Sequence, residues 1–152
     1  MKQSIAFIMG ITTMLLVACH SNPGQENLKS RLAGTWRLLS SESHTKDTIL
    51  RENLNGKEMI KIITGSHFAF LYHDLNKGKD STTATFVSGG GECSFTDSTY
   101  TEHLEYCNYR DWEGLTVSFK AGFSHDTLTL KGVESKNDIG VNQVTIEKYV
   151  KL

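Results

Sequence analysis

A carboxylate among aromatic side chains is the feature of this sequence with the clearest chemical potential. The segment 99–107 alternates as a β-strand does, so every second side chain points to the same face. One face carries Tyr100, Glu102, Leu104 and Tyr106. If this face points inward, Glu102 must be paired or hydrogen-bonded, and a dry site raises its pKa. The expected partners are a ligand, a Tyr hydroxyl, Arg37 or water; alternatively, the face lines a wet mouth and Glu102 is merely solvated.

A second strand-like segment, 67–73, has a strongly aromatic face. Together with apolar residues of other strands, it predicts a pocket with apolar walls and a few placed polar groups, which is typical of small-molecule sites. The expected walls are Phe68, Phe70, Leu104, Val117 and Phe119. The expected polar end consists of Arg37, Tyr72, Tyr100 and Glu102, and Tyr106 shares the Glu102 face.

Other chemistries have little support in the sequence. No pair among the six histidines has the spacing of a helical metal site, and the cysteine spacings of zinc sites are absent. We therefore expect no metal and no cofactor. Gly89-Gly90-Gly91 is not a phosphate cradle, because no helix is predicted after it; it is typical of a bulge or a sharp corner between strands.

Strand-like segments separated by turn signals dominate the chain after residue 32. Eight to ten short antiparallel strands in one domain bury one face each by closing into a barrel, and sequential hairpins favour an up-and-down order. The fold class is therefore all-β, with loops at 46–56 and 74–80. The expected strands are 35–43, 59–63, 67–73, 83–87, 93–95, 99–107, 115–123, 127–133 and 141–150.

The last strand shows how faces are assigned from polarity. Val144, Ile146 and Val150 form its apolar face and are expected in the core. Thr145, Glu147 and Tyr149 form the opposite face, which is expected to meet water.

Two cysteines lie within the predicted barrel. The hairpin between them turns near Asp97, which places Cys93 opposite Glu102 and not opposite Cys107. A disulfide requires closely spaced Cα atoms, so the two residues either pair through a distortion or remain two small buried hydrophobes.

The N-terminus has the layout of a secretory signal. A positive Met1-Lys2 start precedes an apolar run, and small residues stand before Cys19. The run is too short for a transmembrane anchor, which needs about 20 residues. Leu16-Val17-Ala18-Cys19 resembles the bacterial lipobox. This resemblance implies a signal peptide at 1–18, a lipidated Cys19, a flexible tether at 19–31 and a barrel domain at 32–152.

A second resemblance begins at Gly34-Thr35-Trp36. This motif, the segment Lys61–Phe68, the three glycines, Tyr100–Tyr106 and Glu147–Lys151 resemble the lipocalin-like domain of small lipoproteins and secreted proteins from Bacteroidota. The resemblance implies a compact β-barrel with a central cavity, in which Gly34 and Trp36 are structural and Trp36 plugs the closed end.

Together these patterns predict a lipoprotein of the cell envelope whose barrel binds a small, mostly hydrophobic ligand. His20 after Cys19 favours the outer membrane by analogy. The formal net charge of −1 and the lack of a Lys/Arg cluster argue against nucleic acid as a partner. One alternative is a solid barrel that contacts another envelope protein or a glycan. The second alternative, which we rank last, is a cyclase- or isomerase-like enzyme that uses Glu102.

Overall fold

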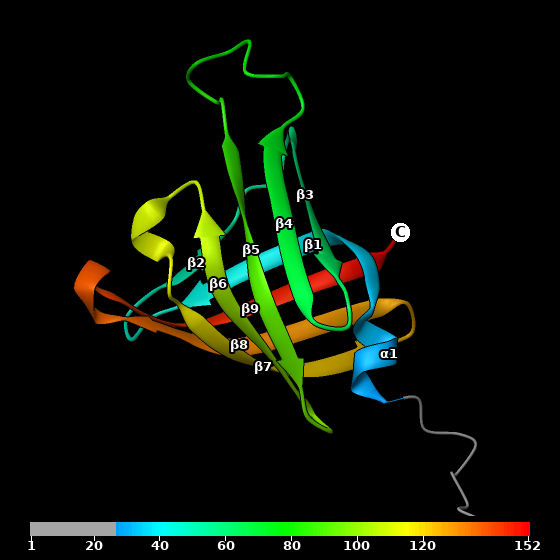
Figure 1. Ribbon diagram of the computed structural model, residues 1–152. Helices are drawn as coiled ribbons and strands as arrows, with labels where there is room; N and C mark the ends of the chain where they lie inside the picture. Colours follow the sequence, from blue (N-terminus) through cyan, green and yellow to red (C-terminus); the bar gives the residue numbers. More distant parts are fainter. Residues whose placement is uncertain (1–26) are drawn as a thin grey trace, which may run out of the picture.

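The computed structural model describes residues 27–152 and shows a closed antiparallel β-barrel (Figure 1). Eight strands follow one another in up-and-down order, and the first also pairs with the last. The predicted fold class is therefore confirmed. The strands are β1 (Gly34–His44), β3 (Lys57–Ile63), β4 (His67–Asp74), β5 (Phe86–Phe95), β6 (Thr99–Cys107), β7 (Thr116–Ser124), β8 (Thr127–Lys136) and β9 (Val141–Lys151).

Four short elements complete the described chain. Strand β2 (Ile49–Arg51) pairs with the second half of β1 and lies in the segment 46–56, where only a loop was expected. The helix α1 (Leu28–Leu32) and the 3-10 helices η1 (Arg110–Trp112) and η2 (Asn137–Ile139) lie at the barrel ends. Within residues 27–152 no helix is long and apolar enough to cross a membrane.

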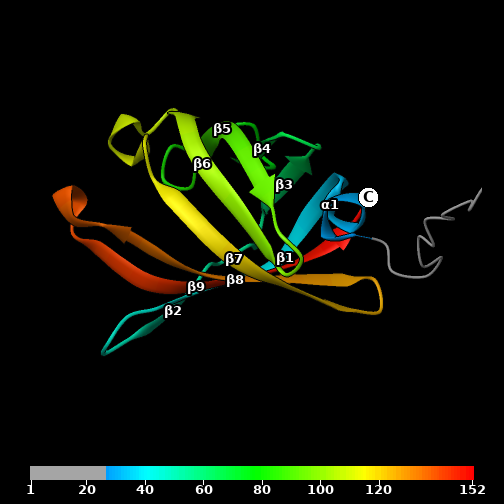
Figure 2. The same cartoon turned by 60° about the horizontal axis from the view of Figure 1, so that its bottom comes forward.

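The helix α1 and the start of β1 close one end of the barrel. Leu28 and Leu32 of α1 are buried in the core, although Leu28 comes from the segment expected as a tether. Trp36 is also buried, and its indole Nε1 donates a hydrogen bond of 2.7 Å to the Leu32 carbonyl. Figure 2 shows α1 beside the ends of β1 and β9. The signal peptide and Cys19 lie outside the described residues.

The three glycines lie inside a continuous strand. The expectation of two strands, 83–87 and 93–95, with a corner between them is wrong, because β5 runs through all three glycines. The expected bulge is present, since the β5–β6 register shifts between Gly90 and Gly91. A Cβ on Gly91 would lie 2.0 Å from the His103 carbonyl oxygen. Glycine thus allows the neighbouring backbones to approach more closely than any side chain permits.

The same bulge reverses the side-chain alternation of β6. Leu104 is opposite Gly91 and Tyr106 is opposite Gly90, so Glu105 is the extra residue on β6. A one-residue shift sends the following side chains to the other face. Cys107 is therefore buried, whereas Tyr106 is 71% exposed. The expectation that Tyr106 shares the inward face with Glu102 is wrong for this reason.

The faces of β9 are also the reverse of the expectation. Thr145 and Tyr149 are buried, and Glu147 points into the barrel with them. Val144, Ile146 and Val150, which were expected in the core, lie on the opposite, outer face and are only partly buried. Polarity fails as a guide here because the barrel interior contains charged groups that need polar partners.

The described cysteines are free thiols. Cys93 pairs with Glu102 across the hairpin, as the position of the turn predicted, and neither Cys93 nor Cys107 forms a disulfide. Within the described residues, the core lies between 28 and 149, and the strands between 34 and 151 form one closed ladder. Because this segment contains both the closed ladder and its core, we expect it to fold without the residues before it.

We predict that Gly91→Ala lowers the free energy of unfolding by about 1–3 kcal/mol, because its Cβ would overlap the His103 carbonyl. Gly122→Ala is the matched control, since no atom lies within 4 Å of a Cβ built there. Urea denaturation of both variants measures the difference. Equal stability of the two variants would contradict the close approach at Gly91.

Candidate functional site

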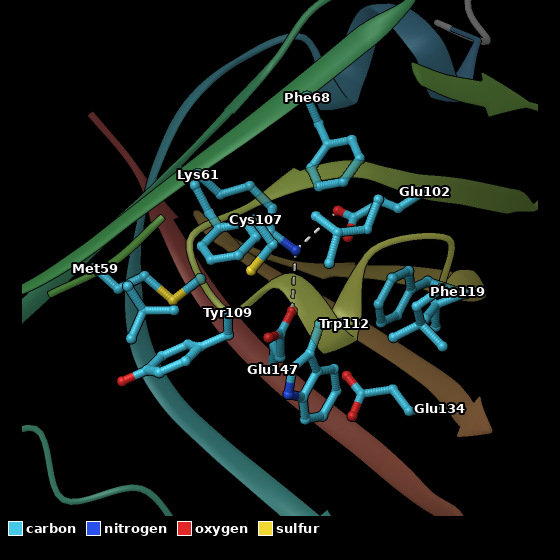
Figure 3. A pocket seen from close by; sticks show the side chains of 15 residues that line it. Met59, Lys61, Phe68, Glu102, Cys107, Tyr109, Trp112, Phe119, Glu134 and Glu147 are labelled. Atoms are coloured by element: carbon cyan, nitrogen blue, oxygen red, sulfur yellow. Dashed lines mark hydrogen bonds and ion pairs between the residues drawn. The ribbon is translucent and has the colours of Figure 1, made fainter. Parts of the chain in front are cut away.

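A cavity of about 380 Å³ occupies the barrel interior and extends toward the end that carries η1 (Figure 3). Its size and mostly apolar lining fit a small organic molecule. Six of the residues proposed from sequence line it, namely Phe68, Phe70, Glu102, Leu104, Val117 and Phe119. The other lining residues are Met59, Lys61, Val87, Cys107, Tyr109, Trp112, Leu115, Glu134 and Glu147.

A buried lysine holds the polar part of the cavity together. Lys61 lies on β3 between the inward residues Met59 and Ile63. Its Nζ donates to a Glu102 oxygen at 2.8 Å and to a Glu147 oxygen at 3.2 Å. These three side chains come from β3, β6 and β9, which are far apart in sequence. Figure 3 shows the ammonium between the two carboxylates.

The ammonium of Lys61 remains charged because its neighbours are acidic. Burial on its own lowers the pKa of Lys61, but the carboxylates of Glu102 and Glu147 outweigh burial and hold the pKa well above its ordinary value. The Lys61 ammonium also lies 5.4 Å from the ring centre of Phe119 and 5.5 Å from that of Tyr149. Aromatic faces at this distance attract a cation.

The carboxylates of the cavity are not equally stabilised. Burial raises the pKa of Glu102, Lys61 opposes this rise, and the negative charge of Glu147 adds to it. The Tyr149 hydroxyl donates to Glu147 at 2.7 Å. Burial also raises the pKa of Glu134, whose hydrogen bond from the Gln143 amide, at 2.7 Å, only partly offsets the effect. The interior therefore holds more carboxyl groups than the single Lys61 ammonium can pair.

The β6–β7 connection brings aromatic side chains to the mouth of the cavity. Tyr109 and Trp112 both line the cavity from this connection. The Trp112 amide donates to the Tyr109 carbonyl at 3.0 Å, and the Glu113 carboxylate accepts from the Cys107 amide at 2.9 Å. These bonds fix η1 against the end of β6.

Four residues of the sequence-based set lie away from the cavity wall. Arg37 is exposed on the outer face of β1, so it is not the partner of Glu102. Tyr72 is partly exposed, and its hydroxyl donates to Glu52. Tyr100 is fully buried between Phe95 and Phe119 but does not line the cavity. Tyr106, as described above, points outward.

Sequence reasoning missed three charged residues of the site. The alternation of side chains was an available signal for two of them. Lys61 shares a face with Met59 and Ile63, and Glu134 shares a face with the buried Leu128 and Leu130. Glu147 alternates with the buried Tyr149. Glu147 was expected to meet water with the polar face of its strand, and Lys61 and Glu134 were not considered as site residues.

Cys107 is the cysteine that lines the cavity, and Cys93 lies outside the lining. Burial raises the pKa of the Cys93 thiol from 9.0 to about 11, which favours its protonated form. Within residues 27–152 no group of three or more His, Cys, Asp or Glu side chains is arranged to hold a metal ion. The arrangement is suited to holding an apolar molecule with one polar end.

Comparison with known proteins adds no assignment. No family model matches this chain, and no curated protein matches it. The functional argument therefore depends on the cavity and its side chains.

We predict that Lys61→Met lowers the free energy of unfolding by about 3–5 kcal/mol near neutral pH, because it leaves buried carboxylates without their cation. Without Lys61, the folded-state pKa of Glu102 rises further above its unfolded value. The folded state then binds the proton more tightly, so the deficit relative to the unmodified protein shrinks as pH falls through that raised pKa.

The matched control is Lys131→Met, which removes an exposed lysine of β8. Urea denaturation of both variants at about pH 7 and about pH 5 measures the effect. A Lys61→Met variant as stable as Lys131→Met would contradict the buried ion-pair network.

Proposed function

We propose that this protein binds a small, mostly hydrophobic ligand inside its barrel. The observation that supports the proposal is the cavity of about 380 Å³, whose walls are mainly Phe, Leu, Val and Met side chains and whose polar groups are few and clustered. Barrels of eight strands are just wide enough for one small ligand. Such a combination of apolar walls and placed polar groups is typical of ligand pockets.

We further propose that the protein is a lipocalin-like lipoprotein of the Bacteroidota type. The eight-stranded up-and-down barrel is compatible with a lipocalin-like fold, and Trp36 packs at its closed end. The signal-like N-terminus and Cys19 support removal of residues 1–18 and lipidation of the cysteine. The lipid at Cys19 would attach the N-terminus to a membrane, and His20 after the cysteine favours the outer membrane by analogy.

The two alternatives have less support. The first alternative, an interaction module, assumes a barrel whose interior is filled by side chains. The cavity of this barrel is evidence against that assumption. An enzyme that uses Glu102 requires a carboxyl group free to exchange protons with a substrate. Glu102 is instead engaged at 2.8 Å by the Lys61 ammonium, which makes ligand orientation a better role for it.

We predict that the chain from residue 20 onward, purified without delipidation, carries a reproducible added mass in native mass spectrometry. Val117→Phe fills the cavity and removes this mass, whereas Lys120→Phe, on the outer face of the same strand, retains it. A ligand-free protein that also takes up no hydrophobic fluorescent probe would contradict ligand binding.

We predict that Cys19→Ala abolishes membrane attachment of the full-length chain. In a bacterial host fed labelled palmitate, the unmodified protein incorporates label and sediments with membranes, because its mature end is acylated. The variant incorporates none. Labelling of the Cys19→Ala variant, or the absence of label from the unmodified protein, would refute lipidation at this residue.

A further inference from the structure

We propose that the ligand is a hydrophobic organic cation, that is, an amine or quaternary ammonium compound with an apolar body. This inference rests on the proposed ligand-binding function and adds the charge of the ligand to it. It follows from the charge inside the cavity, the position of one carboxylate near the mouth, and the aromatic faces around it.

Carboxyl groups outnumber cations in the cavity lining. The described residues that line the cavity include three carboxylates, Glu102, Glu134 and Glu147, and only one cation, Lys61. Lys61 reaches two of these carboxylates, at 2.8 and 3.2 Å. Charges buried among apolar walls are costly unless they are balanced, and a positively charged group would stabilise the carboxyl groups that Lys61 does not pair.

Glu134 is the carboxylate that Lys61 does not neutralise. Among the described residues its hydrogen-bond partner is the neutral amide of Gln143, and it forms no ion pair. It projects from β8 into the cavity, and Trp112 projects into the cavity from the mouth (Figure 3). A cation entering past η1 therefore meets a cavity lined by Trp112 and by a carboxyl group that forms no ion pair with Lys61.

A second polar group in the interior also lacks a partner. The Tyr100 hydroxyl is fully buried near Glu102, Lys61 and Cys93, and no described residue forms a hydrogen bond of regular geometry with it. Buried hydroxyl groups in folded proteins are normally satisfied. Because Tyr100 does not line the cavity, this hydroxyl belongs to the packed surroundings of the charged cluster and not to the groups that a ligand touches.

Aromatic side chains complete a cation site. Tyr109 and Trp112 line the mouth, and Phe70 and Phe119 line the walls. The negative faces of aromatic rings attract organic cations, and aromatic cages are a common means of binding quaternary ammonium groups. The cavity already shows this preference, because the Lys61 ammonium lies 5.4 Å from the Phe119 ring centre.

The same arrangement disfavours an anionic ligand such as a fatty acid. Lys61 is the cation that could receive a ligand carboxylate, and both of its acidic partners would then have to share it. Releasing either partner leaves a buried carboxylate unpaired, which is strongly unfavourable. A neutral ligand avoids this cost but leaves the negative charge unbalanced.

A matched ligand series tests the proposal. The chain from residue 20 onward is titrated with decyltrimethylammonium, decylammonium, decanol and decanoate, which share one apolar body and differ in the charge of the head. Binding is followed by calorimetry and by the intrinsic fluorescence of the two tryptophans, of which Trp112 lines the cavity. We expect both cations to bind at least about tenfold more tightly than decanol, and decanoate to bind most weakly.

Glu134→Gln tests the position of the cation. The variant keeps the size of the side chain and a hydrogen-bonding group, so decanol binding should be unchanged, while affinity for both cations falls about tenfold. Glu92→Gln, an exposed change on the outer face of β5, should alter neither. Unchanged cation affinity in Glu134→Gln would overturn the assignment of this carboxylate.

The outcomes separate this inference from the proposed function. Binding of decanoate or decanol as tight as that of the cations would overturn the cation preference and leave hydrophobic ligand binding intact. Failure of the whole series to bind, with no uptake of a hydrophobic fluorescent probe, would overturn both.

Discussion

One buried ammonium has to satisfy carboxylates from two other strands in the middle of this barrel. Lys61 of β3 reaches Glu102 of β6 and Glu147 of β9, so strands that are not neighbours in the sheet are joined across the interior. Removing Lys61 leaves two carboxylates buried without their cation, and this costs more free energy than the ion pairs contribute. The cluster therefore fixes which side chains fill the interior and where space remains.

The cavity is closed at one end of the barrel and extends toward the other. One end of the barrel is closed by α1 and by Trp36, whose indole is tied to the Leu32 carbonyl. The cavity extends the other way, toward η1 and its aromatic side chains. A ligand that enters at this end meets Trp112 and Glu134 first and the Lys61 cluster last. The carboxyl groups of the cavity and its position at the η1 end thus favour the same kind of ligand, an apolar molecule with a positively charged end.

Much of the fold follows from local patterns in the sequence. The segment 99–107 is a strand with the expected bounds, and Cys93 lies opposite Glu102 because the position of the turn fixes the register. Tyr106 was misplaced because the bulge at Glu105 depends on the close approach of Gly91 to β6, a tertiary contact that alternation does not reveal. Local periodicity ends where a neighbouring strand changes the register.

The candidate site was only partly predictable, because polarity was used to decide which face is inside. That rule is sound for the walls, where Phe68, Val117 and Phe119 are buried. It fails for β9, where Tyr149 and Glu147 face the interior and Ile146 faces outward. Charged residues can be recognised as inward only together with their partners, and Lys61 and Glu147 are 86 residues apart in sequence.

A protonated Lys61 lies among more buried carboxyl groups than it can pair. Nuclear magnetic resonance of the side-chain carboxyl carbons and of the lysine Nζ, followed across the acidic and neutral range, tests it most directly. The account predicts that Lys61 stays protonated throughout and that Glu102 and Glu134 titrate above their ordinary pKa. A neutral Lys61 near neutral pH, or Glu102 and Glu134 titrating at or below the ordinary value, would contradict it.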